Sequence, residues 1–181
     1  MKKLILLGDS LFGQAGKHRI EMLELALNNN YDIYNCAAGG WDTNDIVKKS
    51  AYLAGLKPDV MVLSVGTNDI ASWHHVSLQQ FEDNLLRILE IWKDSKVIFF
   101  LPPPLNEAAQ EAPKIRRNSD LKQYQQVAVQ ICKERGVTYI NSWDIFGPLL
   151  DAGDSYHIDD GVHLSDDGYS ITWSEVAKVL A

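Results

Sequence analysis

Short, mostly apolar runs, of which residues 4–7 are wholly apolar, alternate along the chain with longer stretches in which apolar residues recur at helical spacing. We expect strands over residues 4–7, 31–36, 60–65, 97–101 and 137–140. A short run without polar positions is typical of a strand buried on both faces of a sheet. We expect helices over residues 18–27, 43–53, 78–92 and 119–135, and after Ser165. The segment 78–92 has the clearest apolar face.

Local signals mark where these elements begin and end. Thr43 or Asn44 can cap the helix that follows, and Lys57-Pro58-Asp59 breaks the chain before the third strand. Residues 102–118 begin with three prolines and carry mixed charges, and they are too long for an ordinary connector. We therefore interpret this segment as a lid or a substrate loop.

Five strands separated by helices predict an α/β protein with three layers, α/β/α. Crossovers between parallel strands are almost always right-handed and cover both faces of the sheet. We therefore expect a doubly wound, five-stranded parallel sheet with the flavodoxin-like strand order 2-1-3-4-5. In such sheets ligands bind beyond the carboxyl ends of the strands, where the strand order reverses. The length of 181 residues fits a single domain over 1–181.

Composition narrows the class of protein. Hydrophobic residues make up 46% and charged residues 23% of the chain, as in ordinary globular proteins. The formal net charge is −7, and the densest basic spot is the pair Arg116-Arg117. We therefore expect no nucleic-acid partner. Cys36 and Cys132 lie in apolar segments and are interpreted as buried thiols rather than metal ligands.

No apolar run reaches the roughly 18 residues that a membrane span needs. The run 4–7 is too short for the apolar core of a signal peptide. We therefore expect no membrane span and a cytoplasmic location.

Ser10 ends the first strand in a Gly-Asp-Ser turn and is a candidate nucleophile. A serine hydroxyl needs a base within hydrogen-bond reach. The histidines available are His18, His74, His75, His157 and His163. Gly-Asp-Ser alone is weak evidence, because it recurs at 153–155, where it follows no strand and is interpreted as a turn. The alternative role for Ser10 is a turn or capping serine.

His163 is the preferred base, because Asp160 precedes it by three residues across Gly161. Such a turn can bring the carboxylate back to the imidazole, hold its Nδ1 proton and stabilise the imidazolium. Asp159 is the rival acid. Asp9 and Asp69 also lie at strand ends, and we assign them to loop support.

Acyl transfer also needs donors for the oxyanion of the tetrahedral intermediate. We expect three in an oxyanion hole: the backbone N–H groups of Ser10 and Gly40, and the side-chain amide of Asn68. Trp41 and Trp73 follow Gly40 and Asn68 closely. They either wall a substrate pocket or pack in the core.

No metal is expected. His74 and His75 are adjacent, which rarely suits one ion, and a C-terminal acidic stretch is interpreted as a solvated face. That stretch comprises Asp151, Asp154, Asp159, Asp166 and Asp167.

Four blocks of this sequence resemble those of the SGNH (GDSL-type) hydrolase family, in the same order. The blocks are Gly8-Asp9-Ser10-Leu11, Asn35-x-Ala37-x-x-Gly40, Gly66-Thr67-Asn68-Asp69 and Asp160-x-x-His163. The resemblance implies that Ser10, Gly40, Asn68 and His163 take the four roles that name the family, and that Asp160 completes the triad. Ala37 departs from the glycine or serine of many relatives, and Gly39 competes with Gly40.

The runs 39–43 and 102–105 are similar to the branch of the family that contains isoamyl-acetate-hydrolysing esterases. The resemblance implies a serine esterase that acts without a cofactor on a small-molecule ester, with short-chain or acetyl esters favoured. A lysophospholipase or thioesterase of the same fold is the alternative enzyme. A flavodoxin-like binding module is the alternative from another class, but neither GxxxxGK[ST] nor GxGxxG follows the first strand.

Overall fold

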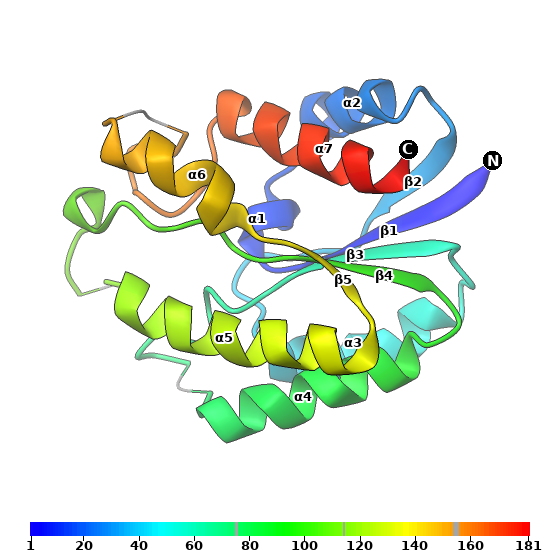
Figure 1. Ribbon diagram of the computed structural model, residues 1–181, viewed down its shortest axis with the longest axis horizontal. Helices are drawn as coiled ribbons and strands as arrows, with labels where there is room; N and C mark the ends of the chain where they lie inside the picture. The colour runs from blue at the N-terminus through cyan, green and yellow to red at the C-terminus, as the bar shows by residue number, and fades with distance from the viewer. Residues whose placement is uncertain (75, 114, 154–155) are drawn as a thin grey trace.

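The computed structural model describes residues 1–74, 76–113, 115–153 and 156–181 (Figure 1). Two earlier points therefore lie outside the described residues: His75, and the Asp154-Ser155 part of the second Gly-Asp-Ser sequence.

A five-stranded parallel sheet forms the middle layer. Its spatial order is β2-β1-β3-β4-β5, which confirms the predicted fold and strand order. The strands are β1 (Lys2–Gly8), β2 (Tyr31–Asn35), β3 (Val60–Ser64), β4 (Lys96–Phe100) and β5 (Thr138–Ile140). The order reverses at β1, because β2 lies on one side of it and β3 on the other. The ends of β1 and β3 are therefore where a ligand site is expected.

Helices cover both faces of this sheet (Figure 1). On one side lie α1 (Ser10–Gly13), α2 (Lys17–Ala26), α6 (Ser142–Asp151) and α7 (Asp166–Leu180). On the other side lie α3 (Thr43–Ala54), α4 (Leu78–Ile91) and α5 (Asn118–Arg135). Within the described residues, no helix is both long and apolar enough to cross a membrane.

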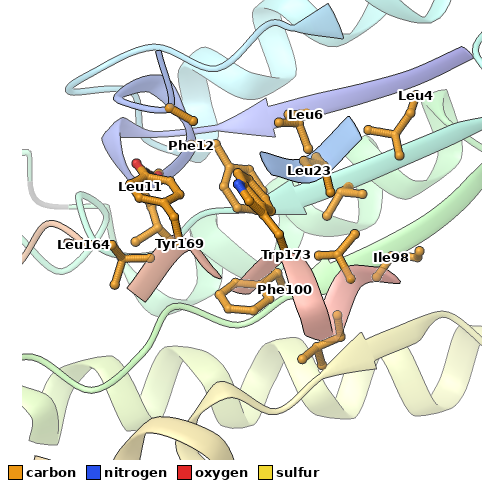
Figure 2. Close-up of a cluster of buried hydrophobic side chains, with 14 of the residues drawn as sticks. Leu4, Leu6, Leu11, Phe12, Leu23, Ile98, Phe100, Leu164, Tyr169 and Trp173 are labelled. Carbon is orange, nitrogen blue, oxygen red and sulfur yellow. Dashed lines mark hydrogen bonds between the residues drawn. The ribbon is translucent and has the colours of Figure 1, made fainter. Parts of the chain in front are cut away.

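The apolar core has two halves, one on each face of the sheet, because successive side chains of a strand point to opposite faces. On β1, Leu4 and Leu6 face one helical layer and Ile5 and Leu7 face the other, as the period of two requires. Figure 2 shows the first half, where the ring of Phe12 of α1 packs at a tilt against the rings of Phe100 and Trp173. This packing anchors the short helix that begins at Ser10.

The structure corrects three local expectations. Asp42, not Thr43 or Asn44, caps α3, because its carboxylate accepts from the N–H groups of Asn44 and Asp45. The four-residue helix α1 was missed, since it is too short to show a period. Helix α6 was missed as well: Gly147-Pro148 looks like a break, but the helix continues through Pro148. Within 102–118 there is one 3-10 turn, η1 (Glu107–Ala109).

Candidate active site

The turn after β1 presents Ser10 at the edge of the sheet. Gly8 lets β1 end against β3, because a Cβ at this position would lie 2.1 Å from the Ser64 carbonyl oxygen. Asp9 is buried and caps α1 by accepting from the Leu11 N–H at 2.8 Å. Ser10 is thus the first residue of α1, where its own N–H has no intrahelical partner.

Three side chains from opposite ends of the chain form a continuous hydrogen-bonded series. His163 Nε2 lies 2.8 Å from Ser10 Oγ, and His163 Nδ1 lies 2.5 Å from Asp160 Oδ2. When Nδ1 carries the ring proton and donates it to the Asp160 carboxylate, Nε2 is the nitrogen that accepts a proton from serine. The arrangement can therefore carry a proton away from Ser10.

A tight turn sets the orientation of the acid. Asp160 Oδ1 accepts from the N–H groups of Val162 and His163, both at 2.9 Å, and Gly161, which directly follows Asp160, has φ +68°. Burial acts to raise the pKa of Asp160, but the hydrogen bonds from His163 and Val162 outweigh it and hold the pKa below its usual value. The carboxylate is therefore ionised at neutral pH. The rival acid, Asp159, makes no hydrogen bond to His163 in the described part of the chain.

Two neighbouring loops bring the expected oxyanion donors to the same edge. Asn68 follows β3, is buried, and donates from Nδ2 to the Trp41 carbonyl at 2.9 Å. Gly40 has φ +81° and open space where a Cβ would stand, so a substrate can approach its backbone. Gly39 also lies beside Ser10, with its would-be Cβ 3.9 Å from the serine Cβ.

A cavity of about 710 Å³ opens over these groups. Its lining includes Ser10, Gly40, Asn68, Trp73, Arg116 and His163. Trp41 is not among the described residues that line it. The Trp41 side chain packs partly buried against the core instead, and only its carbonyl serves the site. Trp73 is therefore the tryptophan that lines the cavity, whereas the placement of Trp41 corresponds to the alternative of core packing.

The segment after β4 forms one wall of the cavity and supplies a residue that sequence reasoning missed. Arg116 reaches back from this segment and donates from Nη2 to Asn68 Oδ1 at 2.8 Å. Ala109, Gln110 and Glu111 line the same wall. Arg116 drew attention only as half of a basic pair, and no motif in the sequence signals its contact.

His74 lies at the cavity in a second histidine–aspartate pair. Its Nδ1 is 3.1 Å from Asp42 Oδ2, so the acid that caps α3 also holds this ring. Among the described residues, no group of three or more His, Cys, Asp or Glu side chains is arranged to hold a metal ion. His18 is exposed on α2, away from the cavity.

Three buried ionisable groups surround the site without lining the cavity. Burial raises the pKa of Asp9 to about 6 and that of Asp69 to about 7. Asp69 accepts from the N–H of Thr43 at 3.0 Å and from its hydroxyl at 2.5 Å, so it ties the loop after β3 to α3. Burial lowers the pKa of His157 to about 4, which leaves this ring neutral at pH 7.

Comparisons with known proteins show the family of this chain. The model of the GDSL-like lipase/acylhydrolase family matches residues 6–171. A rice relative, "GDSL esterase/lipase WDL1", is 27% identical over 69% of this chain and 54% of its own length. The rat "isoamyl acetate-hydrolyzing esterase 1 homolog" is 28% identical over 90% of this chain and 75% of its own. The chain spans about half the length of the rice protein.

A solved structure shows the same fold. The lipase/acylhydrolase from Enterococcus faecalis superposes with a TM-score of 0.90 at 21% identity, covering 99% of this chain and 95% of that one. Because the family model spans most of the sequence, the chain belongs to the GDSL-like lipase/acylhydrolase family. The predicted resemblance is confirmed, including its similarity to isoamyl-acetate-hydrolysing esterases, and so is the class of ester-hydrolysing serine hydrolase at the level of the family.

Proposed function

We propose that this protein hydrolyses short-chain carboxylic esters through an acyl-enzyme on Ser10. The observation that carries the proposal is the series Ser10–His163–Asp160, with links of 2.8 and 2.5 Å, at a cavity that Gly40 and Asn68 also line. A hydroxyl, a base and an acid in this order suit nucleophilic acyl transfer.

In the first step, Ser10 Oγ bonds to the ester carbon and its proton passes to His163 Nε2. The carbonyl electron pair moves onto the oxygen, which becomes an oxyanion. When the intermediate collapses, the bond to the alcohol oxygen breaks and His163 returns the proton to that oxygen. The alcohol leaves, and the acyl group stays on Ser10. Asp160 stabilises the imidazolium throughout.

In the second step, water replaces the alcohol. His163 Nε2 takes a proton from the water as its oxygen attacks the acyl carbon, and it then returns the proton to Ser10 Oγ as the acid is released. Both steps pass through an oxyanion. The N–H groups of Ser10 and Gly40 and the amide of Asn68 are the donors we assign to it.

The cavity lining supports a short acyl group. Its apolar side chains in the described chain are Trp73, Ala109 and Val162, while amide and charged groups such as Gln110 and Glu111 line much of the rest. Each buried methylene contributes about 0.8 kcal/mol only where it leaves water for an apolar surface. A long alkyl chain would gain little here, so we favour acetyl and other short esters over lysophospholipids.

The proposal is tested with p-nitrophenyl acetate, butyrate and octanoate. Wild type should show its highest kcat/KM on acetate or butyrate. Ser10→Ala and His163→Ala should each lower kcat by at least roughly 10³-fold. Ser170→Ala, an exposed serine on α7, is the matched control. Folded wild-type protein that cleaves none of the three esters contradicts the proposal, and a preference for octanoate contradicts the substrate class.

A further inference from the structure

The Asn68 amide is held at both of its ends. Nδ2 donates to the Trp41 carbonyl at 2.9 Å, and Oδ1 accepts from Arg116 Nη2 at 2.8 Å. An amide nitrogen carries two hydrogens. One is used by Trp41, which leaves the other for a ligand in the cavity that Asn68 lines.

These two contacts define which end of the amide is nitrogen. If the amide turned over, Nδ2 would face the Arg116 guanidinium, which has donors only, and Oδ1 would face the Trp41 carbonyl, an acceptor. Both hydrogen bonds would be lost in a side chain that is only 2% exposed. A buried polar group that is left unpaired destabilises the structure, because it has given up its hydrogen bonds to water. Arg116 therefore opposes the orientation in which Asn68 presents oxygen to an oxyanion.

Arg116 also forms a hydrogen bond with the backbone of the loop that carries Asn68. Its Nε donates to the Thr67 carbonyl at 2.9 Å, so one edge of the guanidinium holds both the peptide before Asn68 and the Asn68 side chain. Only a planar fork can make such a pair of bonds, and a lysine ammonium cannot reproduce it.

Arg116 is itself held in position. Its backbone N–H donates to Gln110 Oε1 at 2.7 Å and its carbonyl accepts from Gln110 Nε2 at 3.0 Å. Its guanidinium carbon lies 4.8 Å from the ring centroid of Trp73, within the range of a cation–π contact. The guanidinium is thus positioned before substrate arrives.

We propose that Arg116 is a positioning residue for ester hydrolysis, which fixes the Asn68 amide with an N–H toward the oxyanion and strengthens that donor. The proposal rests on the proposed function of the site. A charged hydrogen bond on Oδ1 draws electron density from the amide, so its N–H becomes a better donor in a low-dielectric site. Burial lowers the pKa of Arg116, while Asp9 and Asp160 act to raise it, and an arginine keeps its charge at neutral pH.

The test is a double-mutant cycle of Arg116→Ala and Asn68→Ala, measured on p-nitrophenyl acetate. Asn68→Ala should lower kcat roughly 10²- to 10³-fold. Arg116→Ala should lower kcat about 10- to 100-fold and change KM by less than about 3-fold. In the Asn68→Ala background, Arg116→Ala should lower kcat by no more than about 3-fold further, because its effect passes through the amide.

Two more variants separate positioning from folding. Arg116→Lys keeps the charge but loses the fork, so its kcat should stay at least about 5-fold below wild type. Arg117→Ala is the matched control. The Arg117 side chain is exposed and contacts Glu107 rather than the cavity. The kcat of this variant should stay within about 2-fold of wild type. Millimolar guanidinium should raise the kcat of Arg116→Ala but not that of the double variant. If Arg116→Ala does not fold, Arg116→Lys carries the same cycle.

Three results would overturn the proposal: an unchanged kcat in Arg116→Ala, an effect that is fully multiplicative with Asn68→Ala, or full activity in Arg116→Lys. These results differ from failure of the proposed function. In that case wild type itself cleaves no ester, and Ser10 reacts with no fluorophosphonate.

Discussion

Gly161 lies in the turn that carries Asp160 and His163 and contacts the segment that forms one wall of the cavity. Substitution of Gly161 by alanine tests the importance of this contact. Gly161 lies between Asp160 and His163 with φ +68°, and its carbonyl accepts from the Asn106 N–H at 2.9 Å. A Cβ at this position would lie 2.2 Å from the Asn106 carbonyl oxygen and 3.0 Å from the Ala109 Cβ.

The magnitude follows from these contacts. An alanine at this φ costs about 1–2 kcal/mol. The Asn106 carbonyl belongs to the backbone and cannot rotate away, so the turn that contains Gly161 and the 102–117 segment must separate by about 1 Å. This separation also breaks the hydrogen bond between the Asn106 N–H and the Gly161 carbonyl, which is worth about 1 kcal/mol. We expect Gly161→Ala to lower the free energy of unfolding by roughly 3 kcal/mol and kcat by roughly 100-fold, since a 1 Å misplacement costs that much.

Gly136→Ala is the matched control for this experiment. Gly136 ends α5 with φ +65°, and no atom lies within 4 Å of its would-be Cβ. It should lose about 1–2 kcal/mol from the backbone alone and keep its kcat. Urea unfolding gives the stabilities and p-nitrophenyl acetate gives kcat. Equal losses of stability in the two variants, or an unchanged kcat in Gly161→Ala, would refute the reasoning.

Three further predictions concern the polar groups around the site. Asp160→Asn should lower kcat by roughly 10²- to 10⁴-fold in steady-state assays, and Asp159→Asn should lower it by much less. A larger loss of kcat in Asp159→Asn would contradict this and identify Asp159 as the acid. Burial raises the pKa of Asp69 to about 7 from 3.8, so wild type should lose stability as pH rises from about 4 to 7. Asp69→Asn should flatten that loss, and parallel pH profiles of urea unfolding would contradict it. Thr43→Val leaves Asp69 and Asn84 short of a buried partner and should cost about 2–3 kcal/mol in thermal or urea unfolding; a loss below about 0.5 kcal/mol would contradict it.

The centre of the sheet was predictable because β3 and most of β1 are buried on both faces. Runs such as 60–65 contain almost no polar position, and this is the pattern that a parallel strand buried on both faces requires. The elements that were missed depend on tertiary contacts. Helix α1 has four residues and is stabilised by the Asp9 cap and by the packing of Phe12 on Trp173. The cap is local, but the contact between Phe12 and Trp173 joins distant parts of the chain and is not visible in local sequence.

The candidate site likewise contains residues that the sequence predicted and residues that it did not. Ser10, Asp160 and His163 were proposed from their chemistry, spacing and family resemblance, and the structure brings them together. Arg116 was not proposed, because its contact with Asn68 spans 48 residues and depends on how the proline-rich segment folds back. The sequence left two alternatives for Trp41, because its closeness to Gly40 fixes the place of its backbone but not the direction of its side chain.

The central claim is that Ser10 is the nucleophile, and covalent labelling tests it most directly. Wild type, Ser10→Ala and His163→Ala are treated with a fluorophosphonate, and the modified peptide is identified by mass spectrometry. We predict one label per chain on Ser10 in wild type, none in Ser10→Ala, and labelling slowed by at least roughly 10³-fold in His163→Ala. Label on another serine, or folded wild-type protein that stays unlabelled, would contradict the account.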